Sequence, residues 1–371
     1  MTPPGTPILK VFGRQDTDGV IHFAAAGADG RVYAGRIGED AAPEVRSLGG
    51  PLVLPVRHLV IDEHGNKVFV ATEDGKLHHW YLENEQEAPF AVFHPGGSSR
   101  AVTAMEFLIG SNSLILGYDD GTIEQWFGVR DREGEEFWPF RKIRTFEKVD
   151  GAVTCIRPSG RNRGFWAGSE HGDLKLYFTT SKRTLLRLRL GGPVTGVAYS
   201  PKLTSVLACD GLGQTGWWSV KNPHPEISLQ TLFGKVWYEG YTEPLYIWQS
   251  TGMSDDFESK FSLMPLIVGT LKGAFYGLLF AIPISIMAAL YTSQFMHFKI
   301  RALVKPSVEI MAALPSVVVG FMAGLWLAPL LENHLVSLLL MTLVIPIMVF
   351  ATVSLWYRFP RSWRNRVPAG M

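Results

Sequence analysis

Cysteine is scarce in this chain of 371 residues, where only Cys155 and Cys209 occur. They lie too far apart in the sequence for a CxxC metal or redox motif. Two interpretations remain open for the pair. The thiols are buried and structural, or they form a disulfide if this part of the chain lies outside the cytoplasm.

Net charge is also nearly absent, at +1, and gives no reason to expect a nucleic-acid partner. No GxxxxGK[ST] motif occurs, so the chain carries no predicted ATP site of its own. His78, His79 and His171 have no Cys or carboxylate neighbours at metal-ligand spacing. No paired carboxylates or catalytic triad stand out either. We therefore predict no enzyme, no metal and no cofactor.

Charge is largely missing from the last third of the chain, where three apolar runs cover about residues 263–295, 308–331 and 335–357. A helix needs about 20 residues to cross a bilayer, at a rise of about 1.5 Å per residue. The first run contains one charge, Lys272, and the second contains Glu309 near its start. The sequence therefore predicts three transmembrane helices.

The basic residues predict the orientation of these helices, because cytoplasmic loops are enriched in Lys and Arg. The segments after the first and third spans are basic, through Lys299, Arg301, Lys305, Arg358, Arg361, Arg364 and Arg366. The segment LENH between spans two and three contains neither Lys nor Arg. Both basic segments should then be cytoplasmic, which puts the N-terminal half outside the cytoplasm.

The first residues, MTPPGTPILK, lack the apolar core of a signal peptide. This conflicts with a large domain on the far side of the membrane. We expect a preceding membrane helix, absent from these residues, to deliver that domain outward.

The N-terminal half contains a repeat, in which a turn glycine is followed five residues later by an aromatic residue. The copies are Gly75–Trp80, Gly121–Trp126, Gly172–Tyr177 and Gly213–Trp218, with a weaker one around Gly30. The glycines recur about every 41 to 51 residues, a period typical of four-stranded propeller blades. An Asp-Gly turn supplies the positive φ of a tight hairpin, and the alternating residues after it suit a half-buried strand.

The repeat resembles a WD40-like β-propeller, of which about five blades are visible. We predict this propeller over residues 1–245, a linker over 246–262 and a transmembrane domain over 263–371. If the ring needs more blades to close, we expect them upstream. The pattern says nothing of the ligand of such a platform.

The membrane half resembles one family closely. Its strongest segments are PLIVGTL, at the head of the first span, and EIMAALPSVVVG (Glu309 to Gly320), within a match that extends from about Tyr246 to the C-terminus. The family is PstC, a permease subunit of the phosphate ABC transporter, in the long form that has a large extracytoplasmic domain before its core helices.

The resemblance implies a multi-pass subunit of the bacterial inner membrane that imports inorganic phosphate, with its N-terminal domain in the periplasm. The implied partners are a PstA-like permease subunit, cytoplasmic ATPase subunits, a periplasmic phosphate-binding protein and membrane lipid. Such permeases have about six core helices and a cytoplasmic EAA-type loop, whereas only three spans and no such loop are predicted here. The chain therefore looks like a fragment, and phosphate rather than a related oxyanion rests on the resemblance alone.

Two charged residues in the spans are candidates for the substrate pathway. Lys272 either faces an anion pathway or snorkels to the interface from a span that begins later, near Gly273. Glu309 is expected in the first turn of a helix that begins near Lys305 and Pro306. It either caps that helix at the interface or contacts another subunit at the edge of the pathway.

The second span also contains polar and small residues. Pro315 should kink the helix, and Ser316 can satisfy a freed carbonyl group. Close helix packing is expected from the small residues Ala312, Ala313, Gly320 and Gly324. The bent helix lies near the translocation path, or it serves packing alone. An alternative for the whole chain is a membrane-anchored propeller that acts as a scaffold or binding module.

Overall fold

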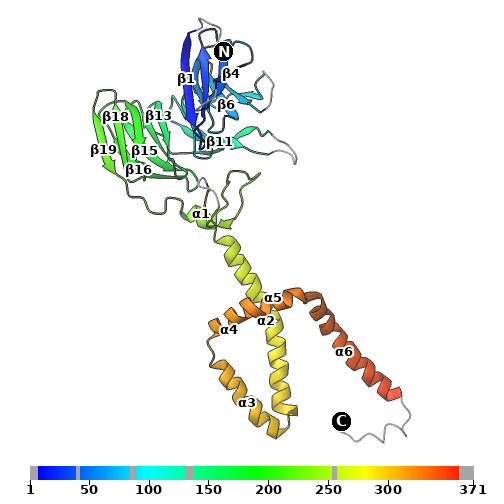
Figure 1. Cartoon of the computed structure of the whole chain (residues 1–371). Coiled ribbons are helices and arrows are strands. Elements are labelled where there is room, and N and C mark those ends of the chain that lie inside the picture. Colours follow the sequence, from blue (N-terminus) through cyan, green and yellow to red (C-terminus); the bar gives the residue numbers. More distant parts are fainter. Residues whose placement is uncertain are drawn as a thin grey trace. The chain divides into compact units, whose positions relative to one another are not determined.

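The computed structural model describes residues 7–38, 42–83, 88–97, 99–130, 137–252 and 257–358. Its contacts divide the chain into two compact units, Met1–Gly273 and Ala274–Met371. The first unit contains the β-sheets, a short helix and the start of the first long helix, and the second contains the rest of that helix and the helices after it (Figure 1).

Five antiparallel sheets form most of the first unit. The first contains β1 (Ile8–Gln15), β2 (Ile21–Gly27), β3 (Val32–Ile37) and β4 (Glu44–Leu48). The second contains β5 (Val56–Ile61), β6 (Lys67–Thr72), β7 (Leu77–Tyr81) and β8 (Ala91–Phe93). The third contains β9 (Val102–Phe107), β10 (Ser113–Tyr118), β11 (Ile123–Gly128) and β12 (Phe140–Thr145). The fourth contains β13 (Val153–Pro158), β14 (Gly164–Ser169), β15 (Asp173–Phe178) and β16 (Arg183–Arg189), and the fifth contains β17 (Val194–Tyr199), β18 (Ser205–Asp210) and β19 (Thr215–Ser219).

The predicted hairpin turns are confirmed in each of the last four sheets. The turn glycines Gly75, Gly121, Gly172 and Gly213 have φ values of 79°, 76°, 86° and 81°. An L side chain rarely adopts this region, whereas glycine enters it at no steric cost. At Gly121 the backbone is also crowded, because an added Cβ would lie 2.2 Å from the carbonyl oxygen of Val149.

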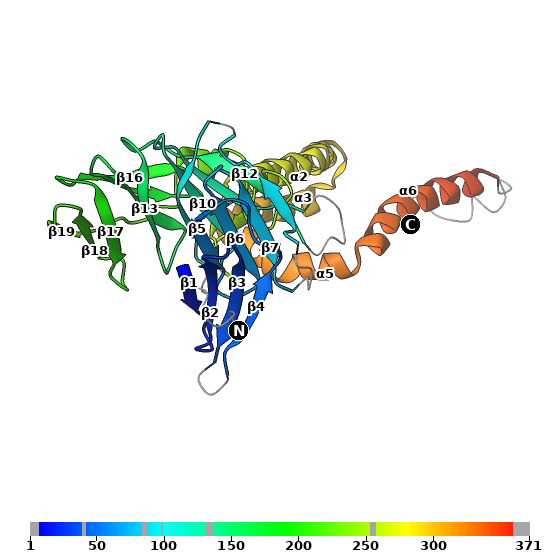
Figure 2. The same cartoon turned by 90° about the horizontal axis from the view of Figure 1, so that it is seen from above.

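Four apolar clusters hold successive sheets together. Val68, Val70 and Trp80 of the second sheet pack against Ala24 and Val32 of the first. The other three clusters join sheets two and three, three and four, and four and five in the same way. The sheets therefore pack in chain order around an arc, as Figure 2 shows.

A closed propeller ring is not what the structure shows. The first strands of the sheets contact one another in the series β1, β5, β9, β13 and β17, and no comparable contact joins β17 to β1 within the described residues. The fifth sheet also has three strands where each of the others has four. Cys155 and Cys209 are both free thiols.

The chain leaves the fifth sheet through α1 (Leu229–Phe233) and a small sheet of β20 (Trp248–Gln249) and β21 (Lys260–Phe261). Ser228 caps α1 by accepting a hydrogen bond from the Thr231 amide. The amide of Leu263 donates to the Leu232 carbonyl over 2.8 Å. The start of the next helix is therefore bonded to α1.

The helices that follow are α2 (Met264–Leu290), η1 (Tyr291–Phe295), α3 (Phe298–Ala312), α4 (Ser316–Met322), η2 (Ala323–Leu327), α5 (Ala328–Asn333) and α6 (Leu335–Arg358). Three helical stretches are long and apolar enough to cross a membrane, namely Met264–Phe295, Ser316–Asn333 and Leu335–Trp356. The second begins at Ser316 instead of the predicted Val308, because α3 ends before Pro315 and α4 starts after it.

Candidate functional site

Lys272 lies on α2, eight residues after the helix begins at Met264 and thus about 12 Å along its axis. Its side chain is exposed. Gly269, Gly273 and Gly277 lie on the same helix four residues apart, and an added Cβ at any of them would have no neighbour within 4 Å among the described residues. This surface leaves room for another backbone to approach closely.

Glu309 does not lie where the sequence led us to expect it. The helix does not begin near Lys305, because His297 caps α3 and the helix continues through Pro306 to Ala312. Glu309 therefore occupies the last turn of α3, where a negative charge meets the negative end of the helix dipole. The predicted role as an N-terminal cap is wrong.

One face of α3 carries Arg301, Lys305 and Glu309, spaced four residues apart. They line a shallow hollow of about 360 Å³ together with Phe298, Ala302 and Pro306. The predicted proximity of Lys305 and Glu309 on one face is thus present, although the helix that holds them starts earlier.

Pro315 interrupts the helix instead of kinking it. The helix α3 ends at Ala312, Ala313 is its C-cap, and Pro315 precedes α4 as its N-cap with extended ψ of 120°. Ser316 is the first residue of α4. A Cβ added at Gly320 or Gly324 would meet nothing within 4 Å in the part of the chain that the structure describes, so their packing role stays a prediction.

A buried ion pair in the first unit was not predicted from the sequence. Arg163 and Glu239 approach within 3.0 Å, and their side chains are 7% and 10% exposed. Ser113 donates a hydrogen bond to the same carboxylate and accepts one from Gln125. Glu239 lies in the segment after the fifth sheet, so this pair fixes that segment against sheets three and four.

Further charges surround the pair. Arg144 donates to the carbonyl oxygens of Thr179 and Trp237, and Thr180 donates to Glu258. Lys260 is 8% exposed and lies 4.7 Å from the centre of the Phe257 ring. A cavity of about 500 Å³ adjoins these groups, with aromatic walls formed by Tyr81, Phe127, Trp138, Phe140 and Phe257.

We predict that Glu239 makes the stability of the first unit depend on pH. Burial raises the pKa of Glu239 to about 7 from 4.5, with Glu258 adding to the rise and Arg163 and Arg144 opposing it. Because the folded-state pKa is the higher one, the proton favours the folded form. The stabilisation is fully present below about pH 4.5 and is lost as the pH rises through 7.

Glu239→Gln removes this titration while keeping the shape of the side chain. We expect the unfolding free energy of the wild type to decrease, relative to that of the variant, as the pH rises from 4.5 to 7. Urea titration followed by tryptophan fluorescence measures both proteins. Parallel pH profiles for the two proteins would contradict the prediction.

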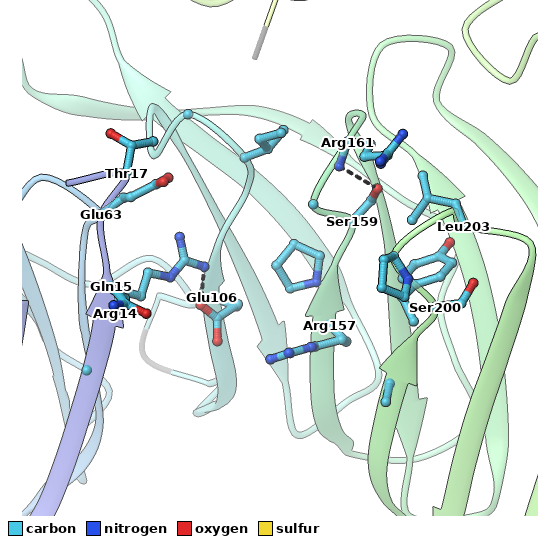
Figure 3. A pocket seen from close by; sticks show the side chains of 18 of the residues that line it. Arg14, Gln15, Thr17, Glu63, Glu106, Arg157, Ser159, Arg161, Ser200 and Leu203 are labelled. Carbon is cyan, nitrogen blue, oxygen red and sulfur yellow. Dashed lines mark hydrogen bonds and ion pairs between the residues drawn. The ribbon is translucent and has the colours of Figure 1, made fainter. Parts of the chain in front are cut away.

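A larger hollow of about 1060 Å³ lies along the ends of the first strands of the sheets. Arg14 on β1 pairs with Glu106 on β9 over 2.8 Å, and Arg157 points from β13 toward Glu106 (Figure 3). On the far side, Ser159 accepts a hydrogen bond from the Arg161 amide (Figure 3). The hollow brings together three guanidinium groups and the carboxylates of Glu63 and Glu106, so its surface is polar and carries charges of both signs.

Known proteins resemble part of this chain. No protein-family model matches it. The chain is similar to phosphate transport system permeases. Two proteins named "Phosphate transport system permease protein PstC 1", from Mycobacterium bovis and Mycobacterium tuberculosis, are each 31% identical to it over 84 residues, which is 23% of this chain. The match spans a quarter (25%) of the length of these relatives.

Taken together, the similarity and the three apolar helical stretches indicate a membrane protein with a permease-like part.

Proposed function

We propose that this chain is part of a permease subunit that imports inorganic phosphate across the bacterial inner membrane. The observation that carries the proposal is the similarity to two phosphate transport permeases, and the three apolar helical stretches fit it. The activity would need a PstA-like subunit, cytoplasmic ATPase subunits and a periplasmic phosphate-binding protein.

In this proposal residues 1–245 form a WD40-like propeller domain in the periplasm. Five blade-like sheets and their glycine turns support the propeller. The basic segment with Lys299, Arg301 and Lys305 supports the orientation, because it follows the first apolar helix and favours the cytoplasmic side.

Lys272 is the residue we propose for the anion pathway. A lysine about 12 Å into an apolar helix is costly in lipid, so it faces protein or water in the assembled transporter. The open glycine surface around it would receive a helix of the partner subunit, which then excludes lipid from the lysine.

We expect Lys272→Ala to abolish most phosphate uptake, because the pathway loses its positive charge. The assay is phosphate uptake in a phosphate-starved strain that lacks its own permease, complemented with the whole reading frame that contains these residues and with its partner subunits. Lys272→Arg keeps the charge and should retain most of the uptake.

The two proposals in this assay can fail separately. Full uptake by Lys272→Ala, at equal membrane abundance, would remove Lys272 from the pathway and leave the permease function standing. No uptake from the unmodified, well-expressed frame would overturn the phosphate proposal itself. The second candidate, a membrane-anchored binding module, would then gain support, and the polar hollow lined by Arg14, Arg157 and Arg161 favours it.

A further inference from the structure

The cavity of about 500 Å³ lies between sheets two and three and the segment that follows sheet five. Its volume is within the range of about 300–1,000 Å³ that is typical of sites for small molecules. Tyr81 and Phe127 line it from β7 and β11, and Phe257, Glu258 and Lys260 line it from the later segment. The described residues that line it all belong to the first unit and include none from the first or the fifth sheet. The cavity therefore does not arise from the open ends of the series of sheets.

The aromatic wall of the cavity is fixed by contacts within the chain. The Tyr81 hydroxyl donates to the Trp138 carbonyl oxygen over 2.8 Å and accepts from the Trp138 amide over 3.2 Å. Arg130 lies over the Trp138 ring, 5.0 Å from its centre, and Phe140 packs edge-on against Phe69. A wall that is already ordered loses little further entropy on binding, so the planar ring of a ligand can pack against it.

The charges that line the cavity do not balance. Three cationic side chains line it, Lys67, Arg163 and Lys260, against two carboxylates, Glu239 and Glu258. Arg163 and Glu239 form the buried ion pair described above. Three positive and two negative charges leave an excess of one positive charge, which a ligand with one negative charge would neutralise.

Lys260 is the buried cation that has no carboxylate partner. Its ammonium group donates to Gln249 Oε1 over 3.1 Å and to the Glu258 carbonyl oxygen over 3.3 Å, and both acceptors are neutral. Among the described residues, its side chain forms no ion pair within 4 Å, although it is only 8% exposed. Burial lowers the pKa of Lys260, because a buried ammonium group is costly without an opposite charge. An anion from outside the chain would supply that charge.

We propose that this cavity binds a small aromatic acid, whose single carboxylate pairs with Lys260 and whose planar ring packs against Tyr81 and Trp138. The site is separate from any transport pathway in the membrane helices. Lys260 lies four residues before Met264, where α2 begins. The bound acid therefore contacts the segment that leads into the first apolar helix.

A binding measurement on the full chain in lipid nanodiscs tests the proposal, with empty nanodiscs as the blank. Equilibrium dialysis compares three probes: indole-3-acetate, the uncharged alcohol indole-3-ethanol, and acetate, which has no ring. We expect indole-3-acetate to bind at least about tenfold more tightly than either of the others, because only it combines the ring with a charge-assisted hydrogen bond. Equal affinities for the acid and the alcohol, or no saturable binding of the acid, would overturn the proposal. Tighter binding of inorganic phosphate at the same site would overturn it as well, since phosphate has no ring.

Two variants locate the binding. Lys260→Met keeps the length of the side chain and removes its charge, so the variant should lose the preference for the acid over the alcohol. Lys235→Met is the matched control, because Lys235 belongs to the same segment and lies 5.8 Å from the centre of the Tyr246 ring, yet it does not line the cavity. Unchanged binding by Lys260→Met, or an equal loss in both variants, would place the acid elsewhere and overturn the proposal. Circular dichroism checks the fold of each variant, and the comparison of probes on the wild type does not depend on either.

Discussion

Replacing Arg163 with alanine should destabilise the first unit by about 3–5 kcal/mol at pH 8, the range found when one partner of a buried ion pair is removed. The carboxylate of Glu239 would stay buried with Ser113 as its remaining hydrogen-bond donor. Arg163 also donates to the carbonyl oxygen of Ile109, so the change leaves a second group unsatisfied. Urea unfolding of the full chain in detergent, followed by tryptophan fluorescence, measures the loss.

The pH dependence and an exposed pair provide the controls. At pH 5 the Glu239 carboxyl of the variant takes up a proton, so the loss should be smaller than at pH 8. Arg36 and Glu44 form a pair whose side chains are 61% and 67% exposed, and Arg36→Ala should cost at most about 1 kcal/mol. Equal losses from Arg36→Ala and Arg163→Ala would show that burial of the pair is not what makes it important.

In a separate variant, Trp166→Ala should lower the free energy of unfolding by about 3–5 kcal/mol. The reason is the cavity that remains when a large aromatic side chain is removed. Trp166 is 0% exposed and lies in the cluster that joins sheets four and five. The neighbouring side chains Leu174, Leu176 and Val206 come from both sheets, so the cavity cannot collapse without moving one sheet relative to the other. The same unfolding assay measures the effect.

Leu212→Ala serves as the matched control, since Leu212 is 66% exposed in the turn between β18 and β19. A surface substitution of this kind usually changes stability by less than about 0.5 kcal/mol. If Trp166→Ala lowered the free energy of unfolding by as little as Leu212→Ala, the contact between sheets four and five would contribute little to stability. Other contacts would then hold the sheets together.

The sheets could be predicted because their signal is local. Each glycine turn and the aromatic residue five positions later belong to one hairpin, and the φ values of Gly75 and Gly121 follow from the turn alone. The repeat predicted about five blades of a propeller, and the structure has five sheets in an open series. Closure of the ring depends on contacts between strands far apart in the sequence, so it stays a prediction.

The ion pair of Arg163 and Glu239 was missed for the same reason. Its members are 76 residues apart in the sequence, and Glu239 lies after the last repeat, where no periodic pattern marks it. In the membrane half, hydropathy predicted the three apolar stretches but misplaced the helix ends around Pro306 and Pro315. Pro306 was taken as a helix start, yet it lies inside α3, and Pro315 was taken as a kink, yet it separates two helices.

The boundary between the two compact units falls within α2, after Gly273, and not in the segment that precedes the helix. Immediately before the helix, the amides of Ser262 and Leu263 donate to the carbonyl oxygens of Ile247 and Leu232. Anyone who wishes to express the sheets alone must decide how much of α2 to keep, because a cut before Leu263 removes the hydrogen bond from its amide to α1.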